Sequence, residues 1–148
     1  MPNAWSRIYR SLFAHYGAQR WWPGETPFEV MVGAILTQNT AWSNVERAIV
    51  RLKDAQALQA GTLLTLADAD LAELIRPAGY FNVKARRLKA LCRHLAEEGV
   101  LDAPERLADQ AGLAELRRRL LGVHGIGEET ADSILLYALD QPSFVVDA

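Results

Sequence analysis

Cysteine is almost absent from this sequence. The 148 residues include one, Cys92. A chain with a single thiol cannot form an internal disulfide, and it cannot supply the four thiolates that an iron–sulfur cluster needs. We therefore expect no iron–sulfur cluster and no cofactor that this chain requires.

Long apolar runs are also missing. No stretch has the length of a membrane span, and no basic start followed by an apolar segment resembles a signal peptide. Half of the residues are nevertheless hydrophobic, which is typical of a globular chain, and the length suits one domain. We expect a cytoplasmic protein that does not bind membranes.

Strand signals are the third absence. No stretch of useful length alternates apolar and polar residues, and no internal repeat is present. Apolar residues instead recur at helical spacing, which predicts an all-α fold. The expected helices cover residues 4–16, 27–36, 41–52, 63–74 (as one or two helices), 83–98, 113–121 and 128–138.

An excess of positive charge is lacking as well, since the formal net charge is −2. Bulk electrostatic attraction to nucleic acid is therefore not expected. Cations do cluster locally: residues 83–96 contain five and no acid, and residues 117–119 are all arginine. Such patches can position a phosphate backbone, but a solvated helix face gives the same pattern.

Glycine is concentrated in one short loop. Gly122, Gly125 and Gly127 precede an amphipathic run in which Ile134, Leu135 and Ala138 have helical spacing. A glycine-rich turn that leads into a helix leaves backbone N–H groups unpaired at the positive end of the helix dipole. This arrangement predicts a phosphate-binding hairpin.

One carboxylate stands out beyond this hairpin. Asp147 lies eighteen positions after Glu129, behind a turn at residues 140–142 and the apolar residues 144–146. A lone acid held against apolar neighbours is a candidate catalytic group. Next to a phosphate-binding hairpin, it suggests chemistry on nucleic acid.

Two further segments are candidate binding elements. Trp21 and Trp22 are adjacent, so one ring can be buried while the other lines a surface or a pocket; alternatively both seal the edge of the core. The polar residues 37–40 follow an almost uncharged helix. They either cap that helix or present a side chain such as Gln38 to a ligand.

These motifs resemble a known family. Val123–Ala131 and the pair Val146-Asp147 resemble the hairpin and the Val-Asp pair of helix-hairpin-helix (HhH-GPD) DNA glycosylases of the endonuclease III superfamily. Within it, Trp21-Trp22-Pro23, residues 36–40 and residues 81–88 are most similar to the 3-methyladenine DNA glycosylase III branch.

The resemblance implies a particular organisation of the chain. Residues 1–25 would be the N-terminal helix and aromatic loop of the second half-domain, and residues 26–148 a six-helix-type domain with its hairpin at 121–131. The C-terminal part of the family fold would be absent from this chain.

The resemblance also implies an enzyme, a base-excision-repair DNA N-glycosylase that flips a damaged base, an alkylated purine, out of double-stranded DNA. The chain would act as a monomer. By position, the base pocket would comprise Trp21, Trp22, Pro23 and Trp42. Contacts to DNA would come from Gln38, which fills the gap left by the flipped base, and from Lys84, Gly125, Ile126, Gly127, Glu129 and Thr130. A monovalent cation would bind the backbone carbonyls of Leu121, Val123 and Ile126.

Position 129 distinguishes two mechanisms in this family. Bifunctional members have a lysine there, whose amine attacks C1′ and leads to strand cleavage. Glu129 cannot form an imine, so we expect a monofunctional glycosylase in which Asp147 is the catalytic carboxylate. An endonuclease III-like glycosylase with lyase activity and a non-catalytic helix-hairpin-helix DNA-binding module are the alternatives.

Overall fold

The computed structural model describes residues 2–147, which form helices and connecting segments without a strand. This confirms the predicted all-α fold. The elements are α1 (Ala4–Tyr16), α2 (Pro27–Leu36), α3 (Trp42–Asp54), α4 (Ala60–Thr65), α5 (Asp68–Leu74), η1 (Arg76–Ala78), α6 (Phe81–Glu97), η2 (Pro104–Asp109), α7 (Leu113–Leu121), α8 (Glu128–Ser133) and η3 (Ile134–Ala138).

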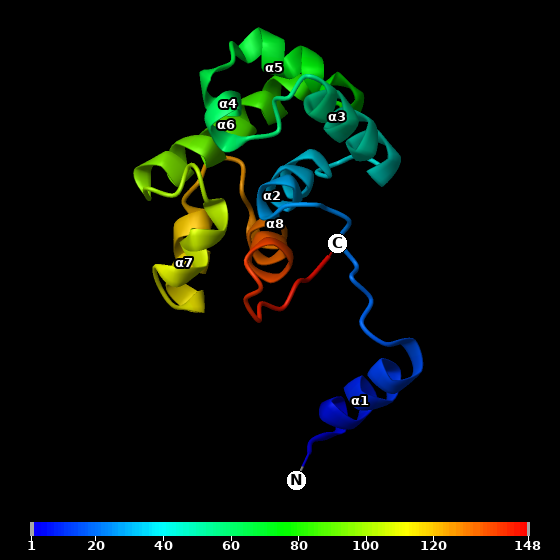
Figure 1. Ribbon diagram of the computed structural model, residues 1–148. Coiled ribbons are helices and arrows are strands. Elements are labelled where there is room, and N and C mark those ends of the chain that lie inside the picture. Colours follow the sequence, from blue (N-terminus) through cyan, green and yellow to red (C-terminus); the bar gives the residue numbers. More distant parts are fainter. Residues whose placement is uncertain (1, 148) are drawn as a thin grey trace.

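Helix α2 lies at the centre of the bundle (Figure 1). Every residue from 28 to 36 is buried, and α2 packs against α3, α6, α8 and η3. Its start follows from local chemistry: the Thr26 hydroxyl accepts the N–H of Glu29 at 3.1 Å, and Pro27 occupies the first turn. The predicted buried central helix is confirmed.

Helix α6 carries most of the basic run, and its apolar face is buried in the core. Its cations are largely engaged inside the protein. Lys89 donates to the Leu66 carbonyl and pairs with Asp68 at 2.8 Å. The basic run therefore does not form the continuous exposed patch that its charge suggested.

Lys84 corrects one prediction. It was expected to contact DNA, but its side chain is 1% exposed, and Nζ donates at 2.8 Å to the carbonyls of Leu36 and Ala78. Burial lowers the pKa of Lys84 to about 8. The prediction is wrong because this lysine joins the end of α2 and the turn η1 to α6 from within the core.

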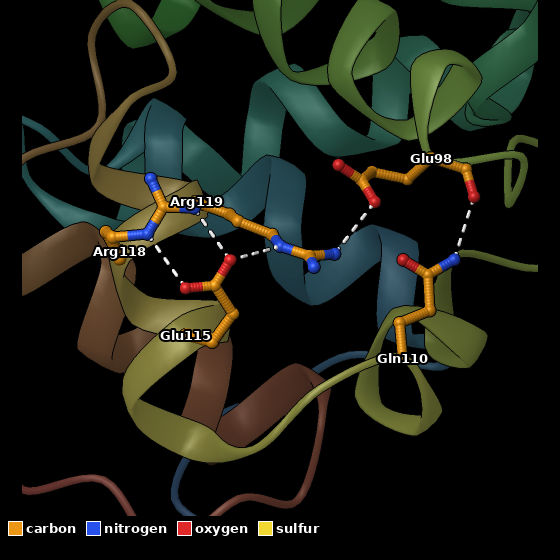
Figure 2. A network of polar contacts seen from close by, with 5 residues as sticks. All are labelled: Glu98, Gln110, Glu115, Arg118 and Arg119. Carbon is orange, nitrogen blue, oxygen red and sulfur yellow. Dashed lines mark hydrogen bonds and ion pairs between the residues drawn. The ribbon is translucent and has the colours of Figure 1, made fainter.

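Two residues of the triple arginine, Arg118 and Arg119, are paired with acids of this chain (Figure 2). Arg119 donates to Glu98 and to Glu115, in both cases at 3.0 Å, and so links α7 to the end of α6. Arg118 forms a two-point contact with the same Glu115. Hydrogen bonds from Arg118 and Arg119 lower the pKa of Glu115 to about 2. Gln110 adds a 2.8 Å hydrogen bond to the Glu98 carbonyl.

Helix α1 stands apart from the bundle, joined to it by residues 17–26 (Figure 1). The predicted bounds are correct, and the Asn3 side chain accepts the N–H of Ser6 at 2.8 Å as its cap. None of its residues is buried, including the large apolar residues Trp5 and Phe13. The division of the chain at residue 25 is still a prediction. Among the described residues, no helix is long and apolar enough to cross a membrane.

The last residues, 139–147, leave η3 as an extended segment and return towards the chain between α1 and α2 (Figure 1). Hydrogen bonds anchor this segment: the Gln141 N–H donates to the Leu135 carbonyl at 2.8 Å, and the Ser143 hydroxyl donates to the Asp132 carboxylate on α8 at 2.7 Å. This return brings the side chain of Asp147 to the aromatic loop.

Replacing Lys84 with methionine should lower the free energy of unfolding by about 2 to 4 kcal/mol, because two buried carbonyls would lose the ammonium donor. Urea unfolding of Lys84→Met and of the control Arg86→Met, at an exposed position of the same helix, provides the measurement. Equal or greater stability of Lys84→Met would show that burying the ammonium costs more than its two hydrogen bonds contribute.

Candidate active site

The glycine hairpin joins α7 to α8. Gly125 has φ +86°, a conformation that side chains rarely adopt, and a Cβ there would lie 2.2 Å from Cγ of Arg87. Glycine is therefore required at this position for two independent reasons, backbone conformation and contact with α6. Gly127 caps α8 without a side chain, which leaves the first N–H groups of the helix without a side-chain partner.

Gln38 holds the hairpin against the end of α2. Its Nε2 donates at 3.0 Å to the Gly125 carbonyl and at 3.0 Å to the Thr130 hydroxyl, while its Oε1 accepts from Arg87 at 2.6 Å. Both ends of the amide are thus engaged in the protein. The Gln38 side chain, which was predicted to enter DNA, links the end of α2 to the hairpin and to α6 in this structure.

The neighbouring Asn39, unlike Gln38, points to the surface. It is exposed, with φ +53°, and it lines the same cavity as the hairpin. Asparagine tolerates this left-handed conformation better than most residues. The loop therefore presents Asn39, rather than Gln38, on its surface.

A cavity of about 690 Å³ lies between this loop and the hairpin. Residues 125–130 form one wall and residues 37–40 form the other, with Arg87 between them. Asp147 from the C-terminal segment also lines it. The carboxylate of Asp147 therefore lies near the hairpin, as the sequence predicted.

A second cavity, of about 610 Å³, is aromatic. The rings of Trp22 and Trp42 meet edge-on with centroids 5.4 Å apart, and the ring of Tyr137 lies 5.2 Å from Trp22. Trp21 and Pro23 also line this cavity. The four residues predicted from the aromatic loop and from position 42 are thus brought together.

The two adjacent tryptophans differ in burial, as predicted by the interpretation in which one ring is buried and the other lines a surface or a pocket. Trp22 packs against the core, whereas Trp21 is 73% exposed beside the cavity. The two cavities share five lining residues, which are Trp22, Thr37, Glu129, Ser133 and Asp147. The two cavities therefore meet at the carboxylates.

Sequence reasoning missed Gly33 and Tyr137. A Cβ at Gly33 would lie 3.3 Å from Nε1 of Trp22 and 3.4 Å from the Trp42 ring, so glycine lets both rings approach α2. Glu129, Ser133 and Tyr137 recur every four residues and line the aromatic cavity together. That spacing was the available signal for Tyr137, although η3 is a π-helical turn.

Asp147 is exposed at the junction of the two cavities and forms no ion pair among the described residues. Its segment is held through Ser143 and Asp132. Arg117 grips the Asp132 carboxylate at two points, 2.8 and 3.2 Å, and this contact lowers the pKa of Asp132. The structural cation is thus bound to Asp132, and Asp147 stays available to the cavity.

Glu129 lies next to Asp147. Partial burial raises the pKa of Glu129, and the charge of Asp147 and a hydrogen bond with it raise this pKa further. The site therefore contains a pair of acids, one of which holds its proton to a higher pH than an ordinary glutamate does.

Comparisons with known proteins agree with this geometry. Residues 32–148 match the family model described as HhH-GPD superfamily base excision DNA repair protein. Over 142 residues the chain is 52% identical to a protein of Methanocaldococcus jannaschii that has the name "Putative DNA repair glycosylase MJ1434". It is 30% identical over 124 residues to endonuclease III of Thermotoga maritima. The chain belongs to the HhH-GPD superfamily of base-excision DNA repair proteins.

A solved structure is similar to this chain in fold as well as in sequence. The 3-methyladenine DNA glycosylase MagIII of H. pylori, bound to 1,N6-ethenoadenine, superimposes with a TM-score of 0.78 at 32% identity, over 95% of this chain. An endonuclease III–DNA complex, at 20% identity and a TM-score of 0.73, shows the shared fold. The chain spans 64% of MJ1434, 66% of MagIII and 52% of the Thermotoga endonuclease III.

Alanine at position 125 should destabilise the protein by about 2 kcal/mol or more, because the left-handed conformation and the overlap with Arg87 both oppose a Cβ. Alanine at position 127, where the Cβ would meet nothing within 4 Å, is the matched control and should change stability by less than about 1 kcal/mol. Urea unfolding measures both. Equal stability of the two variants would contradict the assigned role of Gly125.

Proposed function

We propose that this chain carries the glycosylase site of a base-excision-repair enzyme that flips a damaged base out of duplex DNA and hydrolyses its N-glycosyl bond. One observation carries the proposal: Asp147 lies where a glycine hairpin cavity meets an aromatic cavity. The family and the relatives named above support DNA repair as the setting.

The hairpin and the polar loop would hold the DNA strand. The backbone N–H groups of Gly125 and of residues 127–129 suit a phosphate, because they favour its binding at a helix start and carry no sequence preference. Asn39 is the exposed side chain of the loop, and we assign it the contact with the space that the flipped base vacates, in place of Gln38.

The aromatic cavity would receive the flipped base. Its volume is within the range of about 300 to 1,000 Å³ that is usual for ligand pockets. Trp21, Trp22 and Trp42 offer ring faces and edges that attract a positively charged purine more strongly than a neutral one. This preference favours alkylated purines, and the likeness to a 3-methyladenine glycosylase supports the same substrate class.

Asp147 would then act on the sugar. An alkylated, cationic purine leaves C1′ as a neutral base and takes the electrons of the glycosidic bond with it. The carboxylate of Asp147 stabilises the positive charge that develops on the sugar, and it orients and deprotonates the attacking water.

Strand cleavage through an imine requires an amine in the site, and neither cavity has a lysine among its described lining residues. Lys84, on the neighbouring helix, is buried and donates to two carbonyls. The absence of an amine supports a hydrolytic glycosylase without lyase activity.

A monovalent cation at the hairpin is part of the proposal. Of its three carbonyl ligands, Val123 accepts the N–H of Ile126 at 3.1 Å, and the turn hydrogen bonds among the described residues do not use those of Leu121 and Ile126. Carbonyl oxygens suit such an ion. The enzyme would act on duplex DNA as a cytoplasmic monomer, without an iron–sulfur cluster bound by this chain.

Asp147→Asn should reduce base release from a methylated duplex by about 10²-fold or more, because it removes the negative charge that faces the sugar. Duplex affinity, measured by fluorescence anisotropy, should stay close to that of the wild type. Full base release by this variant would refute the role of Asp147. Wild-type binding without any base release would favour a DNA-binding module.

Borohydride should trap no covalent adduct between this protein and abasic-site DNA, because reduction captures only an imine. Thermotoga endonuclease III serves as the comparison protein in the same gel assay. A trapped band with this chain would contradict the hydrolytic mechanism and favour a glycosylase with lyase activity.

A further inference from the structure

Glu129 and Asp147 form an acid pair without a matching cation. They come from α8 and from the C-terminal segment, and they line both cavities together. The other acids of α8 are paired differently: Arg117 contacts Asp132 at 2.8 Å and Glu128 at 3.7 Å. In the part of the chain that the structure describes, neither Glu129 nor Asp147 takes part in an ion pair.

Within residues 2–147, no charged or titratable group near this pair supplies a cation that would neutralise it. Arg87 reaches the hairpin cavity from α6, but its guanidinium donates to Gln38. Tyr137 faces the pair from η3 across the aromatic cavity, and Glu128 on α8 adds a further negative charge. Two neighbouring carboxylates resist simultaneous ionisation, so one proton is held more tightly.

Glu129 lines the aromatic cavity, where a proton donor would meet the base. Partial burial and Asp147 raise the pKa of Glu129. DNA that covers the cavity would remove water and raise this pKa further. Asp147 is exposed where the two cavities meet.

We propose that Glu129 is the proton donor for the departing base, so that the site also releases neutral modified purines, which leave poorly as anions. This inference rests on the proposed function. It assigns to Glu129 a role in catalysis and to the enzyme a second substrate class beside cationic alkylated purines.

The proposed hydrolysis conserves atoms, electrons and protons. The C1′–N9 bond breaks, its electron pair goes to the base, and the Glu129 carboxyl gives its proton to a ring nitrogen. Water attacks C1′ and yields its proton to the Asp147 carboxylate. That proton then passes along the hydrogen bond between the two carboxyls to Glu129. The net reaction adds water across the glycosidic bond and returns both acids to their starting states.

The test compares two lesions in one duplex context, N7-methylguanine, which is cationic, and 1,N6-ethenoadenine, which is neutral. Single-turnover base release is measured from pH 5 to pH 8 for the wild type and for Glu129→Gln, whose amide can still donate to Asp147. For the wild type, we expect the ratio of neutral to cationic release to fall as the pH rises, because Glu129 loses its proton.

Glu129→Gln should reduce release of ethenoadenine by about 10²-fold or more, since general acids contribute at least that much. Release of N7-methylguanine, whose base leaves as a neutral molecule without a proton donor, should fall much less than release of ethenoadenine, and the pH dependence of the ratio should vanish. Glu129→Asp should restore part of both the rate and the pH dependence. Glu128→Gln, at the adjacent position, should leave the ratio of the two rates unchanged.

Three results would overturn the inference: equal losses on both lesions in Glu129→Gln, no loss on either, or a wild-type ratio that does not change with pH. The first would make Glu129 a DNA-positioning residue. The wild-type ratio needs no variant, so it decides the question even where Glu129→Gln folds poorly. A wild type that releases neither lesion would instead refute the proposed function, and with it the inference.

Discussion

The contact between the glycine hairpin and the end of α2 is the constraint on which the site depends. Gln38 spans it with hydrogen bonds to Gly125, Thr130 and Arg87, and the missing Cβ at Gly125 lets Arg87 pass beneath the turn. A rigid core supports this contact, because α2 is buried along its length. The hairpin, which would hold DNA, therefore has a fixed position relative to the aromatic cavity.

Polar groups inside the molecule serve structure in some places and chemistry in others. Lys84, Asp132 and Glu115 each have a defined partner, so their charges stabilise the fold. Glu129 and Asp147 have none among the cations of the described residues, and they face open cavities. The lack of an ion pair together with a place in the lining of both cavities, rather than the number of charges, distinguishes these two acids.

Much of this could be predicted from sequence, since helix periodicity, caps and glycines are local signals. The bounds of α1 and α2, the hairpin and the place of Asp147 follow from such patterns. The roles of Gln38 and Lys84 did not, because the partners of Gln38 lie 49 to 92 positions away and one partner of Lys84 lies 48 positions away. Tyr137 was missed although its four-residue spacing from Ser133 was visible, because its contact with the Trp22 ring joins residues 115 positions apart.

The central claim is that one carboxylate faces the sugar of a flipped nucleotide. A crystal structure of the protein with duplex DNA that carries a non-hydrolysable abasic-site analogue tests it most directly. We predict the carboxylate of Asp147 within about 3 to 3.5 Å of the position of C1′, a near-attack distance, with the hairpin N–H groups on a neighbouring phosphate. An analogue bound outside the two cavities, or Asp147 turned away from the sugar, would contradict the account.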